Sequence, residues 1–136
     1  MKARRGGALA LIAAVGAALT LTAAAEEPDF FTRLNEARAV VSSGAGKRYF
    51  DGPFSTAFYA QYPARLGQCM KTTGTDEPTG FDMLLKLKAD GRVESSAVMP
   101  ESKLATCYRE LVKTDVFPPP PSRGFWVPVS IRISTE

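Results

Sequence analysis

Two alternating segments on either side of Asp90-Gly91 constrain the fold more than any other feature of this 136-residue chain. In residues 81–88 apolar side chains alternate with mostly polar ones, and residues 93–99 repeat the alternation. A period of two is typical of a strand with one buried face, and Asp-Gly is a strong signal for a hairpin turn. Pro100 ends the second strand because proline cannot donate to the ladder of a sheet. The sequence therefore predicts an antiparallel hairpin.

Two helices are predicted before the hairpin. Residues 30–41 show apolar side chains at helical spacing, and Asp29 is a candidate N-cap for them. Residues 42–46 are small and glycine-rich, which predicts a loop. A second helix is predicted over 55–70, interrupted at Pro63 because proline removes a helical hydrogen bond.

One helix and one strand are predicted after the hairpin. Ser102 is the candidate N-cap of a helix over 103–114. Four prolines at 118–121 predict an extended connector, and residues 125–134 alternate as a last strand. One apolar sheet face and two helices to cover it predict an α+β fold. We expect a two-layer sandwich with a small antiparallel three-stranded sheet, in the order α-β-β-α-β.

The N-terminus has the layout of a secretory signal. Lys2, Arg4 and Arg5 precede an apolar run over residues 8–21, and three alanines ending at Ala25 close it. A bilayer-spanning helix needs about 20 apolar residues, more than this run provides. We therefore expect residues 1–25 to be a cleaved signal peptide that exports the protein to a bacterial periplasm. A retained inner-membrane anchor is the alternative.

The balance of charge after export argues against nucleic acid as a partner. The signal holds three of the 17 Lys and Arg residues and none of the 14 Asp and Glu residues. The mature chain would then carry 14 charges of each sign. Nucleic-acid binding proteins need a basic surface to contact phosphates. The mature chain offers no such excess.

The two cysteines, Cys69 and Cys107, predict a structural disulfide in an oxidising compartment. Both lie on the apolar stripes of predicted helices, so the bond would join those helices. The chain has no histidine. A zinc site and histidine-based acid–base catalysis are therefore not expected, and no phosphate-binding loop or serine nucleophile motif occurs. We expect no enzyme activity, no metal and no small-molecule cofactor.

Several short motifs in residues 55–134 occur in an order found in a known family. These are Tyr62-Pro63, Gly80-Phe81, Ala89-Asp90-Gly91-Arg92-Val93, Ser95-Ser96, Phe117-Pro118-Pro119 and Val127-Pro128-Val129-Ser130-Ile131-Arg132-Ile133. Together they resemble the C-terminal domain family of the TonB energy transducers and the related TolA-type modules. The resemblance divides the mature chain into an N-terminal helix and linker, residues 26–54, and a TonB C-terminal-like domain, residues 55–136.

The resemblance implies a periplasmic module that binds an envelope or outer-membrane protein by adding a strand to its sheet. An open sheet edge presents unpaired N–H and C=O groups that a partner strand can complete. We expect the last strand, with an exposed tryptophan, to be that edge. The predicted partner-binding residues are Trp126, Val127, Val129, Ile131 and Arg132.

Two other arrangements fit the same residues. The edge strand could pair with a second copy of the chain, giving a homodimer. A different class of function is a small secreted inhibitor or immunity-type protein that acts through a surface loop. That function would place the key residues in 71–79 or 118–123.

Overall fold

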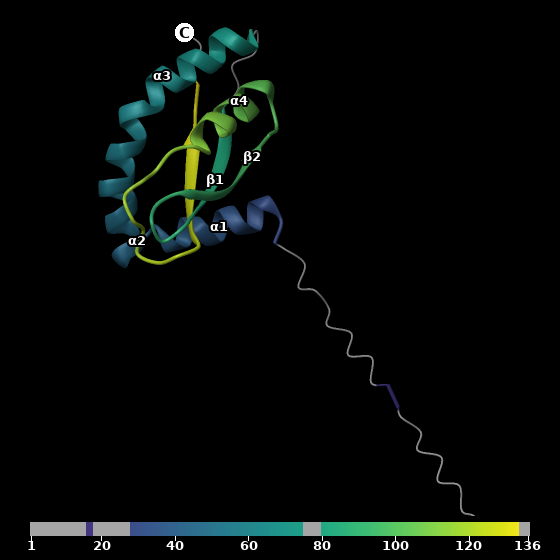
Figure 1. Ribbon diagram of the computed structural model, residues 1–136, viewed down its shortest axis with the longest axis vertical. Coiled ribbons are helices and arrows are strands. Elements are labelled where there is room, and N and C mark those ends of the chain that lie inside the picture. Colours follow the sequence, from purple (N-terminus) through teal and green to yellow (C-terminus); the bar gives the residue numbers. More distant parts are fainter. Residues whose placement is uncertain (1–15, 18–27, 75–79, 134–136) are drawn as a thin grey trace, which may run out of the picture.

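The structure is a computed structural model that describes residues 16–17, 28–74 and 80–133 (Figure 1). Apart from positions 16 and 17, the predicted signal peptide lies outside the described residues. Residues 75–79, which belong to the segment 71–79 that the inhibitor function would use, lie outside them as well. Within the described residues, no helix has the length and hydropathy needed to cross a membrane.

Three antiparallel strands form the predicted sheet: β1 (Phe81–Leu87), β2 (Val93–Met99) and β3 (Phe125–Ile131). Their order is β2-β1-β3, so β1 is central and β3 is an edge strand. The turn between β1 and β2 forms at the predicted place, where Asp90 Oδ1 accepts the Arg92 N–H at 3.0 Å. Gly91 has a φ of 89°, and a Cβ there would lie 1.8 Å from the Phe117 carbonyl oxygen. Only glycine fits this turn.

The helical elements are α1 (Phe30–Val40), α2 (Gly44–Tyr49), the π-helical turn η1 (Phe50–Phe54), α3 (Ser55–Thr73) and α4 (Lys103–Val112). Both predicted N-caps are confirmed. Asp29 Oδ1 accepts the Thr32 N–H at 2.8 Å, and Ser102 Oγ accepts the Ala105 N–H at 3.1 Å. The α+β class and the order of the elements that the sequence predicts are confirmed.

Two predictions about breaks in the helices are wrong. The glycine-rich segment 42–46 was expected to be a loop, but α2 begins within it at Gly44. Gly46 is buried there, and a Cβ on it would lie 2.3 Å from the Val40 carbonyl oxygen. This glycine therefore allows two backbones to approach closely. Pro63 does not interrupt α3 either. Both Pro63 and Tyr59, whose carbonyl loses its helical partner, are exposed, so water can satisfy that carbonyl.

Helices α3 and α4 cover one face of the sheet, as predicted. The apolar side chains of β1 on this face belong to a main core of 18 buried residues. Tyr108 of α4 is its largest fully buried side chain. The predicted disulfide is confirmed: it joins Cys69 of α3 to Cys107 of α4, with their Cα atoms 5.7 Å apart.

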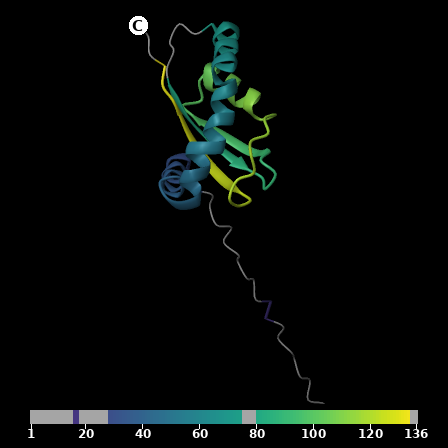
Figure 2. The same cartoon turned by 90° about the vertical axis from the view of Figure 1, so that its left-hand side faces the viewer.

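Helix α1 covers the opposite face, so the sheet lies between α1 on one side and α4 on the other (Figure 2). It adds a third layer to the two that the sequence predicts. Leu34 and Ala37 of α1 pack on Leu84 of β1, with Phe30 and Trp126 partly buried beside them. The segment that connects α1 to α3 also contributes to the fold, because the main core includes one residue each from α2 and η1.

Candidate functional site

The outer edge of β3 is the first component of the candidate site. The hydrogen bonds of β1 determine which backbone groups of β3 point toward this edge. The Lys88 N–H donates to the Arg92 carbonyl at 2.8 Å, so the backbone of Lys88 is directed toward β2. Backbone groups alternate along a strand, which directs those of the odd-numbered β1 residues toward β3. The Gly124 N–H accordingly donates to the Leu87 carbonyl at 2.9 Å.

The register then divides the residues of β3 into two sets. Those opposite the odd-numbered β1 residues direct their backbone toward β1; they are Phe125, Val127, Val129 and Ile131. Trp126, Pro128 and Ser130 direct theirs toward the free edge. Pro128 fits this assignment because a strand tolerates proline where the missing N–H would face outward. Among the described residues, no other strand pairs with this side of β3.

A groove of about 320 Å³ runs along this edge, between α1 and the start of α3. Residues 128–130 of β3 line it, together with Arg38 of α1 and Val41, the C-cap of that helix. The opposite wall comes from η1 and the first turns of α3. We call this feature the edge groove. In this groove, side chains from helices on both sides of the sheet lie beside the outward backbone groups of β3.

Four stacked aromatic rings follow one another on the α3 side, and the first three of them line the edge groove. Ring centroids are 5.8 Å apart for Phe50 and Phe54, 5.7 Å for Phe54 and Phe58, and 5.5 Å for Phe58 and Tyr62. We call these four residues the aromatic ladder. Beside it, Tyr59 also lines the groove and is 65% exposed. Large exposed aromatic side chains of this kind are typical anchors of interfaces.

The π-helical turn η1 sets the position of the first rings. It contains Pro53, whose missing N–H breaks the regular helical pattern, and Ser55 Oγ donates to the Phe50 carbonyl at 2.5 Å across the turn. π-helical turns within helices occur frequently at functional sites. Here the turn brings Phe50 and Ser55 to the rim of the edge groove.

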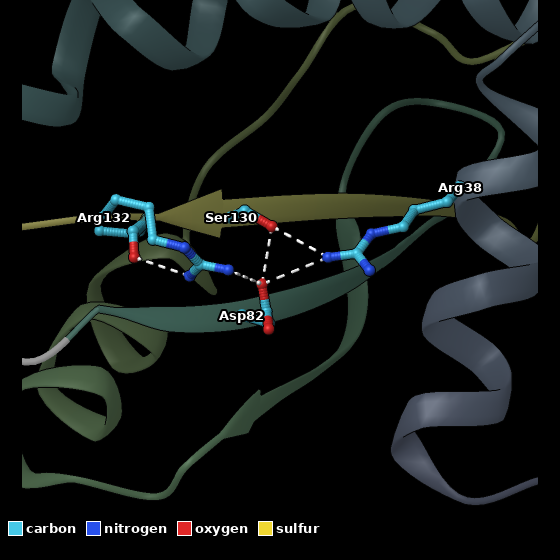
Figure 3. A network of polar contacts seen from close by, with 5 residues as sticks. Arg38, Asp82, Ser130 and Arg132 are labelled. Carbon is cyan, nitrogen blue, oxygen red and sulfur yellow. Dashed lines mark hydrogen bonds and ion pairs between the residues drawn. The ribbon is translucent and has the colours of Figure 1, made fainter.

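A cluster of polar side chains lies at the edge of β3 (Figure 3). Asp82 Oδ1 accepts the Ser130 hydroxyl at 2.6 Å, and the same oxygen lies 3.3 Å from Arg132 Nη2 and 3.5 Å from Arg38 Nη2. Arg38 Nη2 also donates to Ser130 Oγ at 3.2 Å. We call these residues the Asp82 cluster. It holds two guanidinium groups and one carboxylate, so it carries an excess positive charge.

The predicted partner-binding residues occupy three different environments. The side chains of Val127, Val129 and Ile131 are buried in the main core, so they anchor β3 to the α3 and α4 side of the sheet. Trp126 is half-buried rather than exposed: it packs beside α1, with the Arg33 guanidinium 4.6 Å from its ring centroid. Arg132 is exposed and belongs to the Asp82 cluster.

Sequence reasoning did not find Arg38, Tyr59 or the aromatic ladder as site residues. The ladder has a sequence signal, since its members recur every fourth residue from Phe50 to Tyr62. Rings four residues apart meet on one face of a helix. Arg38 has no such signal, because only the packing of α1 brings it to Ser130.

Two residues with raised pKa values, Tyr49 and Asp115, make contacts that hold the site in place. Burial raises the pKa of Tyr49 to about 12, and its hydroxyl donates to the Pro118 carbonyl at 2.7 Å, fixing the start of the proline connector. Burial also raises the pKa of Asp115, although the Arg65 guanidinium pairs with its carboxylate and opposes the shift. These contacts hold the connector and the α3–α4 pair beside the sheet.

The chain was compared with protein-family models, with curated proteins and with solved structures, and it matches none of them. The resemblance to the TonB C-terminal family therefore stays a prediction from the motifs quoted above.

Proposed function

We propose that this chain is an exported protein of the bacterial envelope that binds an extended segment of a partner protein along the free edge of β3. The observation that carries the proposal is the edge groove, in which the outward backbone groups of Pro128 and Ser130 lie beside the exposed side chains of Arg38 and Tyr59. An added strand gains main-chain hydrogen bonds from such an edge and specificity from flanking pockets.

Three features of the sequence support this function. The resemblance to the TonB C-terminal family implies strand addition to a sheet edge. The signal-like residues 1–25 imply export, and the Cys69–Cys107 disulfide suits an oxidising compartment such as the periplasm.

A partner of different sequence fits the edge better than a second copy of this chain. Pro128 lies in the middle of the outward set and has no N–H to donate. A foreign strand that covers β3 loses one main-chain hydrogen bond at this position. A symmetric pair of β3 strands brings Pro128 from both copies and loses two. The proposed complex is therefore a hetero-complex.

Site-specific photocrosslinking in intact bacterial envelopes tests the proposal. A photoreactive phenylalanine replaces Tyr59 at the edge groove or, as a matched control, Val116 at the far end of the sheet. The two side chains are 65% and 64% exposed. We expect an adduct with an envelope protein from position 59 and none from position 116.

A backbone variant shows whether an adduct depends on strand addition. Ser130→Pro removes an outward N–H while leaving the hydrogen bonds between β3 and β1, and Ser130→Ala controls for the lost hydroxyl. We expect the adduct to disappear in Ser130→Pro and to persist in Ser130→Ala. An adduct that survives both changes contradicts the proposal, as does one formed only from a probe at Ser122, which would favour the inhibitor function. Proline at Val129 is unsuitable because it breaks pairing with β1.

A further inference from the structure

The edge groove has two chemically different walls, and a strand added to β3 would present one set of side chains to each. Side chains of a strand alternate between the two faces of its sheet. Extending the sheet past β3 would therefore direct every second partner side chain toward η1 and α3, and the others toward α1. This inference rests on the proposed function and concerns which partner sequence the groove selects.

The α3 side of the groove is apolar and aromatic. Phe50 and Phe58 of the aromatic ladder line it, and exposed Tyr59 extends it. The rings are held by stacking on their neighbours, so they form a preformed surface. Apolar or aromatic partner side chains would bury area here, which is favourable.

The α1 side of the groove carries the excess positive charge. The Arg38 side chain lines the groove and is 48% exposed. Its carboxylate neighbour is Asp82, and the Asp82 oxygen that contacts Arg38 also contacts Arg132 and Ser130 (Figure 3). One carboxylate cannot neutralise two guanidinium groups. Arg38 therefore has N–H donors and charge available for a second carboxylate.

We infer that the bound segment alternates apolar or aromatic residues, facing the α3 wall, with at least one acidic residue that faces Arg38. The acidic residue falls in the set directed toward α1, so its direct neighbours in the partner sequence are the residues that face the α3 wall. A lysine or arginine at the same position would be repelled by the excess charge of the Asp82 cluster.

Three end-blocked synthetic peptides test this specificity. Each alternates valine or phenylalanine with threonine, and the central threonine is kept, replaced by aspartate, or replaced by lysine. Binding is measured by NMR titration of the ¹⁵N-labelled mature chain, following the amide signals of Trp126 and Ser130. An exposed or half-buried ion pair changes affinity modestly. We expect the aspartate peptide to bind roughly three- to fivefold more tightly than the threonine peptide, and the lysine peptide most weakly.

Substitutions in α1 show which arginine is responsible for the preference for the aspartate peptide. Arg38→Gln should make the aspartate and threonine peptides bind equally. Arg33→Gln is the matched control on the same helix, because that side chain stacks on Trp126 and does not line the edge groove. It should leave the preference unchanged. Tyr59→Ser should weaken all three peptides by a similar factor, because it alters the apolar wall alone.

The outcomes separate this inference from the proposed function. If the three peptides bind the β3 edge with equal affinity, the charge inference is wrong and edge binding stands. If Arg38→Gln keeps the aspartate preference, the inference is wrong as well. If no peptide moves the Trp126 and Ser130 signals, both the inference and the proposed function fail.

Discussion

The central strand β1 places alternate side chains in two separate cores of very different size. On the side of α3 and α4, the main core contains 18 buried residues, and the Cys69–Cys107 disulfide joins the two helices above it. On the side of α1, the buried set is Leu34, Ala37 and Leu84. The first side therefore holds most of the folding free energy.

The difference bears on the edge groove because its two walls come from the two sides. The aromatic ladder belongs to the strongly held side, which would give the proposed partner a rigid surface. Arg38 belongs to α1, which is attached through the small core, the Trp126 contacts and the Asp82 cluster. Weakly held elements unfold locally at a lower free-energy cost than global unfolding of the main core. The α1 wall is accordingly the part of the groove that can adjust to a partner.

The largest expected effect comes from removing the disulfide on the strongly held side. A double variant, Cys69→Ala with Cys107→Ala, opens a loop whose ends are 38 residues apart. The chain-entropy relation gives a loss of about 4 kcal/mol in the free energy of unfolding. Urea denaturation of the variant and the oxidised parent measures the difference. A loss under about 1 kcal/mol would show that this side does not depend on its crosslink.

A truncation in the small core should have a smaller and more local effect. Leu34→Ala removes one of its three buried side chains, and we expect about 2 kcal/mol of destabilisation, the low end for a buried leucine. Hydrogen exchange should accelerate in α1 while α3 and α4 stay protected. Val40→Ala, at an exposed position on the same helix, is the control. Equal acceleration in all helices would mean that the two sides unfold together.

The smallest effect concerns Tyr49, which belongs to the main core and anchors the proline connector. Tyr49→Phe removes its hydrogen bond to Pro118 and should cost about 1 kcal/mol. The folded-state pKa of Tyr49 is about 12, above the ordinary value of 10.0. Its contribution to stability is therefore complete below pH 10 and is lost as pH rises through about 12. Urea midpoints between these pH values should fall less steeply for Tyr49→Phe than for the parent. Identical slopes would contradict the assignment.

The parts of the fold that the sequence predicts correctly depend on local signals. Asp90-Gly91 forms its turn through its own backbone and side chain, and Asp29 and Ser102 cap helices through contacts three residues away. The disulfide was predictable because only two cysteines exist, both on apolar helical stripes.

The candidate site was less predictable because it depends on packing between distant segments. The position of Arg38 follows from α1 lying on the second face of the sheet, and nothing in residues 30–41 specifies that face. The alternation in the last strand predicts that Trp126 is exposed, but α1 covers it. The aromatic ladder requires a helix to continue past Pro53, which a local rule predicts as a break. A π-helical turn permits the continuation.

Residue-resolved amide hydrogen exchange of isolated residues 26–136, with and without the aspartate peptide, tests the central claim most directly. The claim is that the backbone of β3 is paired on one side and open on the other. It predicts slow exchange for Val127 and Val129 in both samples. Trp126 and Ser130 should exchange fast in the free chain and slowly in the complex. Slow exchange of all four amides in the free monomer would show that the edge is already closed, and would contradict the account.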